Sequence, residues 1–226
     1  MVRLVGVSLS VALTVCDVAA QAGQAGQAAP DKAAPAGNCR GAINPAESVR
    51  FGGYRSNDGK LQFRIAYDRS VTPFHEEAFQ KAIAMWNRYT DLTGIVLEDR
   101  TRGDADFRVQ LGAPPRRRGV ESTTCASYES NGSFIWISAL AMTEIVQARD
   151  VQAAARIYAH ELGHALNVRH KTGQSVMVEG DPQAGCLDLG TKILTEVQRA
   201  DAEDVLKCAH SVHGGERAAG LPQPRR

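Results

Sequence analysis

Residues 160–170 of this 226-residue chain read HELGHALNVRH, which places three histidines and one glutamate within eleven residues. On an α-helix, residues four apart lie one turn apart on the same face, so His160 and His164 can bring two imidazoles to one cation. Glu161 projects beside them, close enough to polarise a metal-bound water without being a ligand. A catalytic zinc needs three protein ligands and an open position for that water. The run therefore predicts a metal site that needs one more ligand from another direction.

The third ligand requires the helix to end soon after His164. Asn167 is the residue that can end it, because after Gly it is Asn that most often adopts the left-handed conformation found beyond helix C-termini. Such a turn would bring His170 back toward the metal. The alternative is a surface helix whose histidines are merely solvated. Half of the six histidines of the chain fall in this window, which argues against that alternative.

The charge balance narrows the class of protein. Lys and Arg number 26 against 25 Asp and Glu, so the net charge is +1. Nucleic-acid binding needs a concentrated positive face, and we therefore expect no nucleic-acid partner. A mean hydropathy of −0.26 with one short apolar run excludes a membrane protein with several spans.

The first twenty residues have the pattern of a secretory signal peptide. Arg3 precedes the apolar stretch 4–15, and small residues follow at 18–20. The apolar stretch is too short to span a bilayer comfortably, although a retained anchor is the alternative. We expect a secreted protein, extracellular or periplasmic, that has no membrane contact once residues 1–20 are removed.

The remaining chain divides by composition. Residues 21–44 are a low-complexity tether or a short pro-segment, because their Ala, Gln, Gly and Pro cannot bury enough apolar surface to order the chain. Residues 45–212 form the expected folded domain. Residues 213–226 are expected to be a disordered tail.

Four cysteines remain after removal of the signal, and export would place them in an oxidising compartment. They are Cys39, Cys125, Cys186 and Cys208. Four cysteines allow three pairings, and the sequence does not decide among them. We favour Cys186–Cys208, which closes a short loop, together with Cys39–Cys125.

Hydrophobic periodicity predicts an α+β fold, with a few strands around one helix and further helices after them. A helix opens at Thr72-Pro73 and its unit ends at Gly94, a second covers 151–166, and a third covers 195–208 with Thr195 and Gln198 as a capping box. Residues 112–131 are expected to be a long loop. The expected strands are 61–67, 95–97, 105–111 and 133–137.

With Ser175-Val176-Met177 following the histidine run, the sequence resembles the metzincin zinc peptidases and, within them, the matrixin-like branch. Residues 78–93 and 103–107 also look like the first helix and third strand of that catalytic domain. The resemblance implies a twisted, mostly parallel sheet with an antiparallel edge strand, an active-site helix and a C-terminal helix. It also implies that Met177 forms a Met-turn, an apolar floor beneath the zinc ligands. Asn167 departs from the Gly usual in the family.

The resemblance further implies a zinc metalloendopeptidase acting on proteins or peptides. One catalytic Zn2+ would be held by His160, His164 and His170, and Glu161 would be the general base. An extended peptide would lie along an edge strand formed by residues 133–137, which include Phe134, Ile135, Trp136 and Ile137. A buried strand with Trp136 in the core is the compatible alternative.

Several weaker features have two interpretations. Asp104, Asp106 and residues 56–59 could contact calcium, but a charge pair beside a strand and a hairpin turn are favoured, so calcium is unsupported. The residues left over do not suggest a second zinc. A zinc-blocking role for Cys39 would leave an odd number of cysteines, and a structural disulfide is favoured.

Two other functions compete with a monomeric peptidase. One is a secreted binding module that keeps the fold without catalysis, and the retained Glu161 argues against it. The other is a metal-dependent hydrolase that acts on a non-peptide bond.

Overall fold

The computed structural model describes residues 54–55, 59–100, 105–112, 124–129, 134–181 and 184–212. The predicted signal peptide, the 21–44 segment, the 213–226 tail, Cys39, Asp104 and the side chain of Cys208 lie outside the described residues. Within those ranges, no helix combines the length and the apolar character needed to cross a bilayer.

A six-stranded mixed sheet forms one layer, in the strand order β1-β2-β4-β6-β5, with β3 also pairing with β2. The three pairings among β2, β3, β4 and β6 are parallel, whereas β1 and β5 run antiparallel to their neighbours. The α+β class with a mostly parallel sheet and an antiparallel edge strand is thus confirmed. The strands are β1 (Tyr54–Arg55), β2 (Leu61–Tyr67), β3 (Ile95–Asp99), β4 (Phe107–Gly112), β5 (Ala126–Glu129) and β6 (Phe134–Ser138).

The edge of the sheet is not where we expected it. Strand β6 covers the predicted 133–137 strand, but it pairs with β4 on one side and β5 on the other. The edge is β5, which falls inside the predicted 112–131 loop. The prediction that Phe134–Ile137 form an open edge strand is therefore wrong. Four residues reading ASYE carry too little apolar periodicity to indicate a strand in sequence.

The two faces of β6 differ as a half-buried strand requires. Ile135 and Ile137 are fully buried beneath the helices. Phe134 and Trp136 are only half-buried, and the Trp136 indole N–H donates to Glu129 on β5 at 3.1 Å. The alternative that placed Trp136 in the core is therefore wrong as well.

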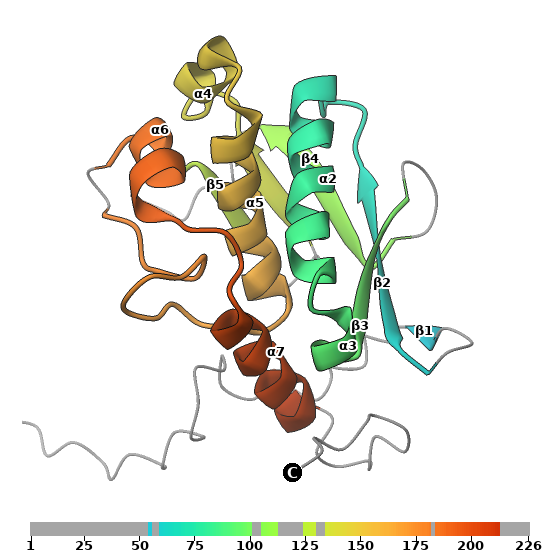
Figure 1. Cartoon of the computed structure of the whole chain (residues 1–226). Helices are drawn as coiled ribbons and strands as arrows, with labels where there is room; N and C mark the ends of the chain where they lie inside the picture. Colours follow the sequence, from blue (N-terminus) through green and yellow to red (C-terminus); the bar gives the residue numbers. More distant parts are fainter. Residues whose placement is uncertain are drawn as a thin grey trace, which may run out of the picture. The chain divides into compact units, whose positions relative to one another are not determined.

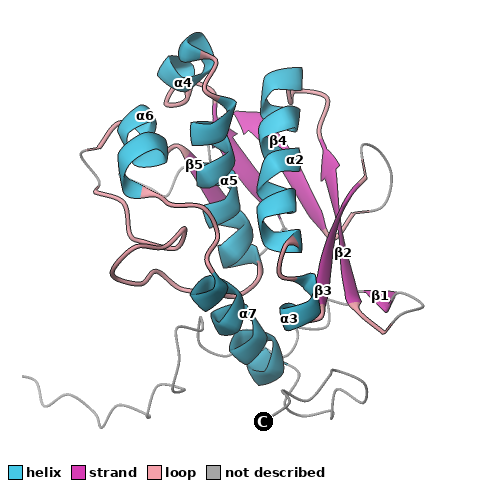
Figure 2. Ribbon diagram, in the orientation of Figure 1, coloured by secondary structure: helices cyan, strands magenta, loops and turns pink. Residues whose placement is uncertain are grey.

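Helices α2 and α5 pack side by side against one face of the sheet (Figure 1), and Figure 2 separates this helical layer from the strands. The other helices of the described chain are shorter, and α7 is the last of them. The helices are α2 (Pro73–Asn87), α3 (Thr90–Thr93), α4 (Thr143–Ala148), α5 (Val151–Ala165), α6 (Cys186–Asp188), the π-helix η1 (Leu189–Ile193) and α7 (Arg199–Val212).

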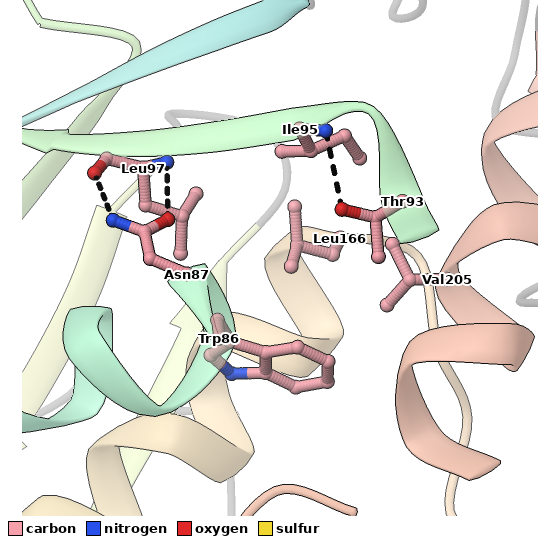
Figure 3. A pocket seen from close by; sticks show the side chains of 7 residues that line it. All are labelled: Trp86, Asn87, Thr93, Ile95, Leu97, Leu166 and Val205. Atoms are coloured by element: carbon pink, nitrogen blue, oxygen red, sulfur yellow. Dashed lines mark hydrogen bonds between the residues drawn. The ribbon is translucent and has the colours of Figure 1, made fainter. Parts of the chain in front are cut away.

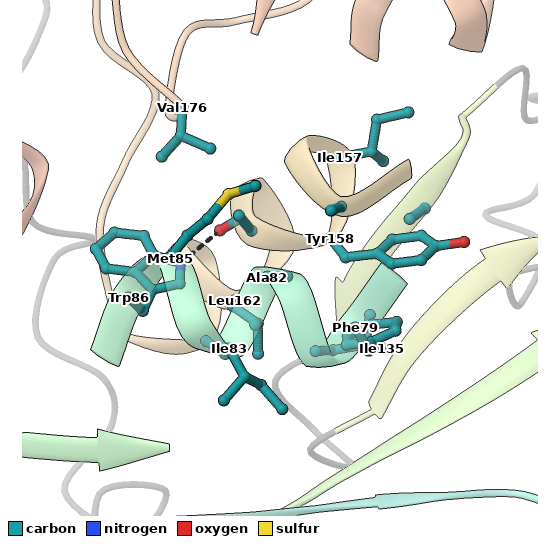
Figure 4. Close-up of a cluster of buried hydrophobic side chains, with 14 of the residues drawn as sticks. Phe79, Ala82, Ile83, Met85, Trp86, Ile135, Ile157, Tyr158, Leu162 and Val176 are labelled. Carbon is teal, nitrogen blue, oxygen red and sulfur yellow. Dashed lines mark hydrogen bonds between the residues drawn. The ribbon is translucent and has the colours of Figure 1, made fainter. Parts of the chain in front are cut away.

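Aromatic packing and hydrogen bonds fix α2 against α5. Phe79 and Tyr158 stack with ring centroids 4.3 Å apart, and the Trp86 indole N–H donates to the carbonyl of Ala159 at 2.9 Å (Figure 4). These contacts lie on α5 one to two residues before His160. The apolar side chains of α2 therefore hold the helix that bears the histidines.

A small crevice lies at the end of α2, where Asn87 bridges to β3. The Asn87 amide donates to the carbonyl of Leu97 at 2.8 Å and accepts from its N–H at 2.9 Å (Figure 3). None of the three histidines lines this crevice, so it is a packing feature of the core rather than part of their site.

Helix α7 begins at Arg199, four residues after the predicted start. The carboxylate of Asp201 accepts from the backbone N–H of Gln198 at 2.8 Å, which is the acidic half of a capping box. The predicted box of Thr195 with Gln198 is thus displaced by three residues. Thr195 instead donates its hydroxyl to the carbonyl of Glu196 at 3.0 Å.

One disulfide is present among the described residues, and it joins Cys125 to Cys186. Cys125 immediately precedes β5, and Cys186 begins α6. The favoured pairings Cys186–Cys208 and Cys39–Cys125 are therefore wrong. Cys186 is not paired with Cys208, because α6 packs near the start of the edge strand rather than near α7.

Candidate metal centre

The three histidines of the 160–170 run converge on one point. The Nε2 atoms of His160 and His164 are 3.1 Å apart, those of His160 and His170 are 3.1 Å apart, and those of His164 and His170 are 3.0 Å apart. His164 is buried, His160 is half-buried and His170 is exposed. The cluster thus opens to solvent on the side of His170 while its first two members are supported by the helix.

The turn that brings His170 back begins where the sequence predicted it. Helix α5 ends at Ala165, and Asn167 adopts the left-handed conformation with φ of 69°. The N–H of Asn167 donates to the carbonyl of His164 at 3.0 Å, and that of Val168 donates to the carbonyl of Gly163 at 2.9 Å. These two bonds form a Schellman motif, with Asn at the position where Gly is usual.

Backbone carbonyls fix which nitrogen faces the centre. The Nδ1 of His160 lies 2.7 Å from the carbonyl oxygen of Val176, and the Nδ1 of His164 lies 2.9 Å from that of Val168. A carbonyl can only accept, so each Nδ1 carries the proton and each Nε2 presents a lone pair to the centre. The third histidine differs, since His170 Nδ1 lies 4.0 Å from the carboxylate of Glu179.

The donor set fits zinc. A tetrahedral zinc with Zn–N bonds of about 2.0–2.1 Å holds its nitrogens about 3.3–3.4 Å apart. The observed separations of 3.0–3.1 Å need to open by only about 0.3 Å. Three lone pairs aimed at one point repel each other unless a cation lies between them. Three imidazoles also leave room for the water that a catalytic zinc requires, so the cluster can hold a single zinc ion.

Glu161 lies on the side of α5 that faces the sheet edge. Its side chain is 7% exposed, and its Oε2 accepts from the backbone N–H of Tyr128 at 2.7 Å. Ser138 donates to the carbonyl of Cys125, so the alternation of an antiparallel pair turns the N–H of Tyr128 away from β6. The carboxylate is therefore held at the outer edge of β5, where no other described strand pairs.

Met177 lies directly beneath the helix that carries the ligands. It is fully buried, and a Cβ added at Gly163 would overlap its sulfur and approach Trp86 Cζ2 to 3.0 Å. A glycine inside a helix is unfavourable by about 1 kcal/mol relative to alanine. Gly163 is therefore explained by the close approach of Met177, which places the thioether against the residue before His164.

Three features of this region were not predicted from the sequence. The close packing at Gly163 could have been predicted, because a glycine within an alanine-rich helix indicates that another group approaches the backbone there. Nothing in the sequence indicates the contact of Tyr128 with Glu161, because Tyr128 contributes its backbone N–H, which every residue except proline has. Nothing indicates the pairing of the Lys171 ammonium with Asp201 and Asp204 either, because that pairing depends on how α7 docks. Burial acts to lower the pKa of Lys171, but these two carboxylates outweigh it and raise the pKa.

Other metal positions receive no support among the described residues. The group formed by His160, His164 and His170 is the one set of three or more clustered ligands found in the described ranges. Asp106 accepts from the backbone N–H of Arg64 at 2.7 Å and pairs with its guanidinium at 3.4 Å, so it serves the sheet. Asp104 and residues 56–58, named above for calcium, lie outside the described residues.

Comparison with known proteins gives distant structural similarities. No family model matches the chain, and no curated protein matches it. The chain is similar to archaemetzincin from Methanopyrus kandleri, with a TM-score of 0.49 and 11% identity over 69% of this chain and 99% of that one. It is also similar to high choriolytic enzyme 1 from Oryzias latipes, a hatching enzyme zinc-protease, with a TM-score of 0.43 and 14% identity over 75% and 98%.

A third similarity is to archaemetzincin from Archaeoglobus fulgidus in complex with malonate, with a TM-score of 0.42 and 14% identity over 64% of this chain and 99% of that one. With identities of 11–14% and TM-scores no higher than 0.49, the chemistry assigned to this chain rests on its own residues. Those residues are a three-histidine cluster fit for zinc and a buried glutamate beside it.

Proposed function

We propose that this protein is a secreted zinc endopeptidase of the metzincin type. The observation that carries the proposal is the convergence of three Nε2 lone pairs from His160, His164 and His170 beside a carboxylate held at a sheet edge. A purely structural zinc is normally enclosed by four protein ligands, whereas three ligands with an exposed member leave a position for water. The geometry thus favours a catalytic metal.

Each residue has a defined part in peptide hydrolysis. When bound, zinc lowers the pKa of a water molecule toward neutrality and polarises the carbonyl of the scissile bond. Glu161 takes the proton of the attacking water on its carboxylate and later delivers it to the leaving amine. The backbone N–H of Tyr128 restrains this carboxylate, so that it cannot swing away from the site.

The strand expected to bind the substrate is the edge strand β5 rather than β6. An extended peptide that pairs with an edge strand is bound through its main chain, which makes recognition largely independent of sequence. On the outer edge of β5, the backbone N–H of Tyr128 donates a hydrogen bond to the carboxylate of Glu161. A peptide that pairs with this edge therefore passes directly beside the base. The expected partners are proteins or peptides.

The remaining assignments follow from the same residues. One zinc is the expected cofactor, and Met177 is the floor beneath its ligands, as the matrixin-like resemblance implies. The signal-like residues 1–20 and the Cys125–Cys186 disulfide support secretion, because disulfides persist in oxidising compartments. We expect the protein to act as a monomer.

The test is zinc-dependent cleavage of an unfolded, alkylated protein by the full chain. We expect one zinc per chain, loss of cleavage on chelation and recovery on addition of zinc. Glu161→Ala should bind zinc without cutting. Glu203→Ala is the matched control, because Glu203 is a half-exposed glutamate on α7 that pairs with Arg199 at 3.1 Å, away from the histidine cluster in sequence.

The outcomes separate the competing functions. A chain that binds one zinc but cuts neither this substrate nor a peptide library would be a binding module. Hydrolysis of an ester or amide that is not a peptide, without peptide cleavage, would indicate the non-peptide hydrolase. Cleavage that persists in Glu161→Ala would refute the role of the base.

A further inference from the structure

Asp201 is a fully buried carboxylate at the start of α7, and it lies in contact with the loop between α5 and α6. Its Oδ1 is 2.6 Å from the ammonium of Lys171 and accepts from the hydroxyl of Ser175, also at 2.6 Å. Its Oδ2 accepts from the backbone N–H of Gln198 at 2.8 Å. A buried charge that loses its partners is strongly destabilising, so these contacts restrain the loop tightly.

Ser175 extends this restraint to His160. Its hydroxyl oxygen accepts from the backbone N–H of Met177 at 2.8 Å, while its proton goes to Asp201. The peptide group that joins Val176 to Met177 carries both this N–H and the Val176 carbonyl, which lies 2.7 Å from His160 Nδ1. The oxygen that sets the orientation of His160 is thus held between two anchored residues.

Lys171 extends the restraint to His170, its neighbour in sequence. Its ammonium also contacts Asp204 at 3.0 Å, and its backbone N–H donates to the carbonyl of Met177 at 3.0 Å. Lys171 and Val178 form a bridge that ties the two arms of the loop together. His170 is the exposed member of the three histidines, so these loop contacts bear directly on its position.

The described residues between α5 and α6, 166–181 and 184–185, form no helix or strand of their own, yet they carry one zinc ligand and the carbonyls that orient the other two. Groups that orient metal ligands typically change metal affinity 10- to 100-fold when they are removed. We propose that Lys171, Ser175 and Asp201 form a polar anchor that positions His160 and His170 for zinc. Lys171 and Ser175 are accordingly positioning residues. The inference rests on the proposed function only in requiring that the cluster binds zinc.

The test compares zinc binding by the full chain and by the variants Ser175→Ala and Lys171→Met. Zinc affinity is measured by competition with a chelator, and ligand geometry by the visible spectrum of the cobalt(II)-substituted protein. Thermal unfolding of each metal-free protein shows that binding is measured on folded chains. Lys207→Met removes an exposed ammonium 3.5 Å from Asp204, and Ser70→Ala removes an exposed hydroxyl that accepts from Leu111 N–H, so they are the matched controls.

We expect each anchor variant to bind zinc about 10- to 100-fold more weakly and to shift the cobalt spectrum, while both controls stay within about twofold of the parent. Lys171→Arg keeps the charge and should recover part of the affinity lost in Lys171→Met. Anchor variants that match the parent in affinity and spectrum would overturn the inference, whatever their unfolding temperatures. A parent that binds no zinc would overturn both proposals. Zinc binding with these differences but without peptide cleavage would overturn the peptidase alone.

Discussion

The carboxylate of Glu161 and the backbone N–H of Tyr128 are joined by a 2.7 Å hydrogen bond between helix α5 and the edge strand β5. This bond connects the two parts that a peptidase must align, because the proposed base lies on the helix and the peptide would pair with the strand. Glu161 and Tyr128 are both buried. The position of the proposed base is thus set by the same strand that would receive the substrate.

Shortening this side chain should separate catalysis from metal binding. Glu161→Asp withdraws the carboxylate by one methylene and breaks its bond to Tyr128, while His160, His164 and His170 are unchanged. We expect kcat/KM to fall by about 100- to 1000-fold, within the usual contribution of a general base. Zinc affinity should change by less than about threefold in the same competition assay, since Glu161 is not a ligand. A comparable loss of zinc would show that Glu161 supports the metal instead.

The disulfide between Cys125 and Cys186 should stabilise the fold and align β5. It closes a separation of 61 residues, for which loop entropy gives a contribution of about 4 kcal/mol to the free energy of unfolding. Replacing both cysteines by serine should therefore lower the unfolding free energy by about 2–4 kcal/mol in urea and raise KM. The parent in reductant should behave like the double variant. An unchanged urea midpoint would contradict this role.

The sequence predicted the parts of the fold that local patterns encode. Strand β2 matches residues 61–67, and α5 starts at the predicted Val151 and ends one residue before the predicted Leu166. The three histidines could be placed together because helical spacing and one left-handed residue determine their directions. Asn167 adopts that conformation even though the metzincin sequences that the chain resembles usually have Gly there.

Features that depend on tertiary docking were not predictable in this way. Strand β5 is recognised by its pairing with β6 rather than by its own composition, so the open edge was assigned one strand too far along the chain. The start of α7 depends on the buried Asp201, whose carboxylate accepts from the N–H of Gln198 and also pairs with the half-buried Lys171. The cysteine pairing likewise follows from where α6 packs, which the spacing of cysteines does not contain.

His75 should make stability depend on pH. It is 3% exposed on α2, and its Nδ1 lies 2.6 Å from the hydroxyl of Tyr158 on α5. Burial lowers the pKa of His75 below its ordinary value of 6.5, because the charged form is poorly solvated there. As pH falls below about 6.5, the unfolded chain takes up a proton that the folded chain resists, so stability is lost.

The measurement is the free energy of unfolding of the metal-free protein between pH 5 and pH 7.5, compared with His75→Gln. Gln keeps a hydrogen-bonding group near Tyr158 but does not titrate. The parent should lose stability toward pH 5 more steeply than the variant, and the difference isolates His75 from the three clustered histidines. Parallel pH profiles for the two proteins would rule out this contribution.

Asn167 has a backbone conformation that ends helix α5 well, but its side-chain amide lies in an unfavourable buried position. Asn167 is 5% exposed, and neither its amide nitrogen nor its amide oxygen has a hydrogen-bond partner among the described residues. A buried polar group without a partner is unfavourable by about 1–3 kcal/mol. Gly would adopt the left-handed backbone without this burden, although its greater freedom in the unfolded chain offsets about 0.5–1 kcal/mol. Asn167→Gly should therefore raise the free energy of unfolding by about 1 kcal/mol.

Asn167→Ala separates the two contributions. Ala also removes the unpartnered amide, but like Asn it keeps a Cβ in the left-handed region, which is unfavourable by about 1–2 kcal/mol relative to Gly. Urea unfolding of the metal-free proteins should rank both variants above the parent. Because Gly preserves the turn, it should keep the zinc affinity of the parent. A Gly variant less stable than the parent would mean that the amide packs more favourably than its missing hydrogen bonds indicate.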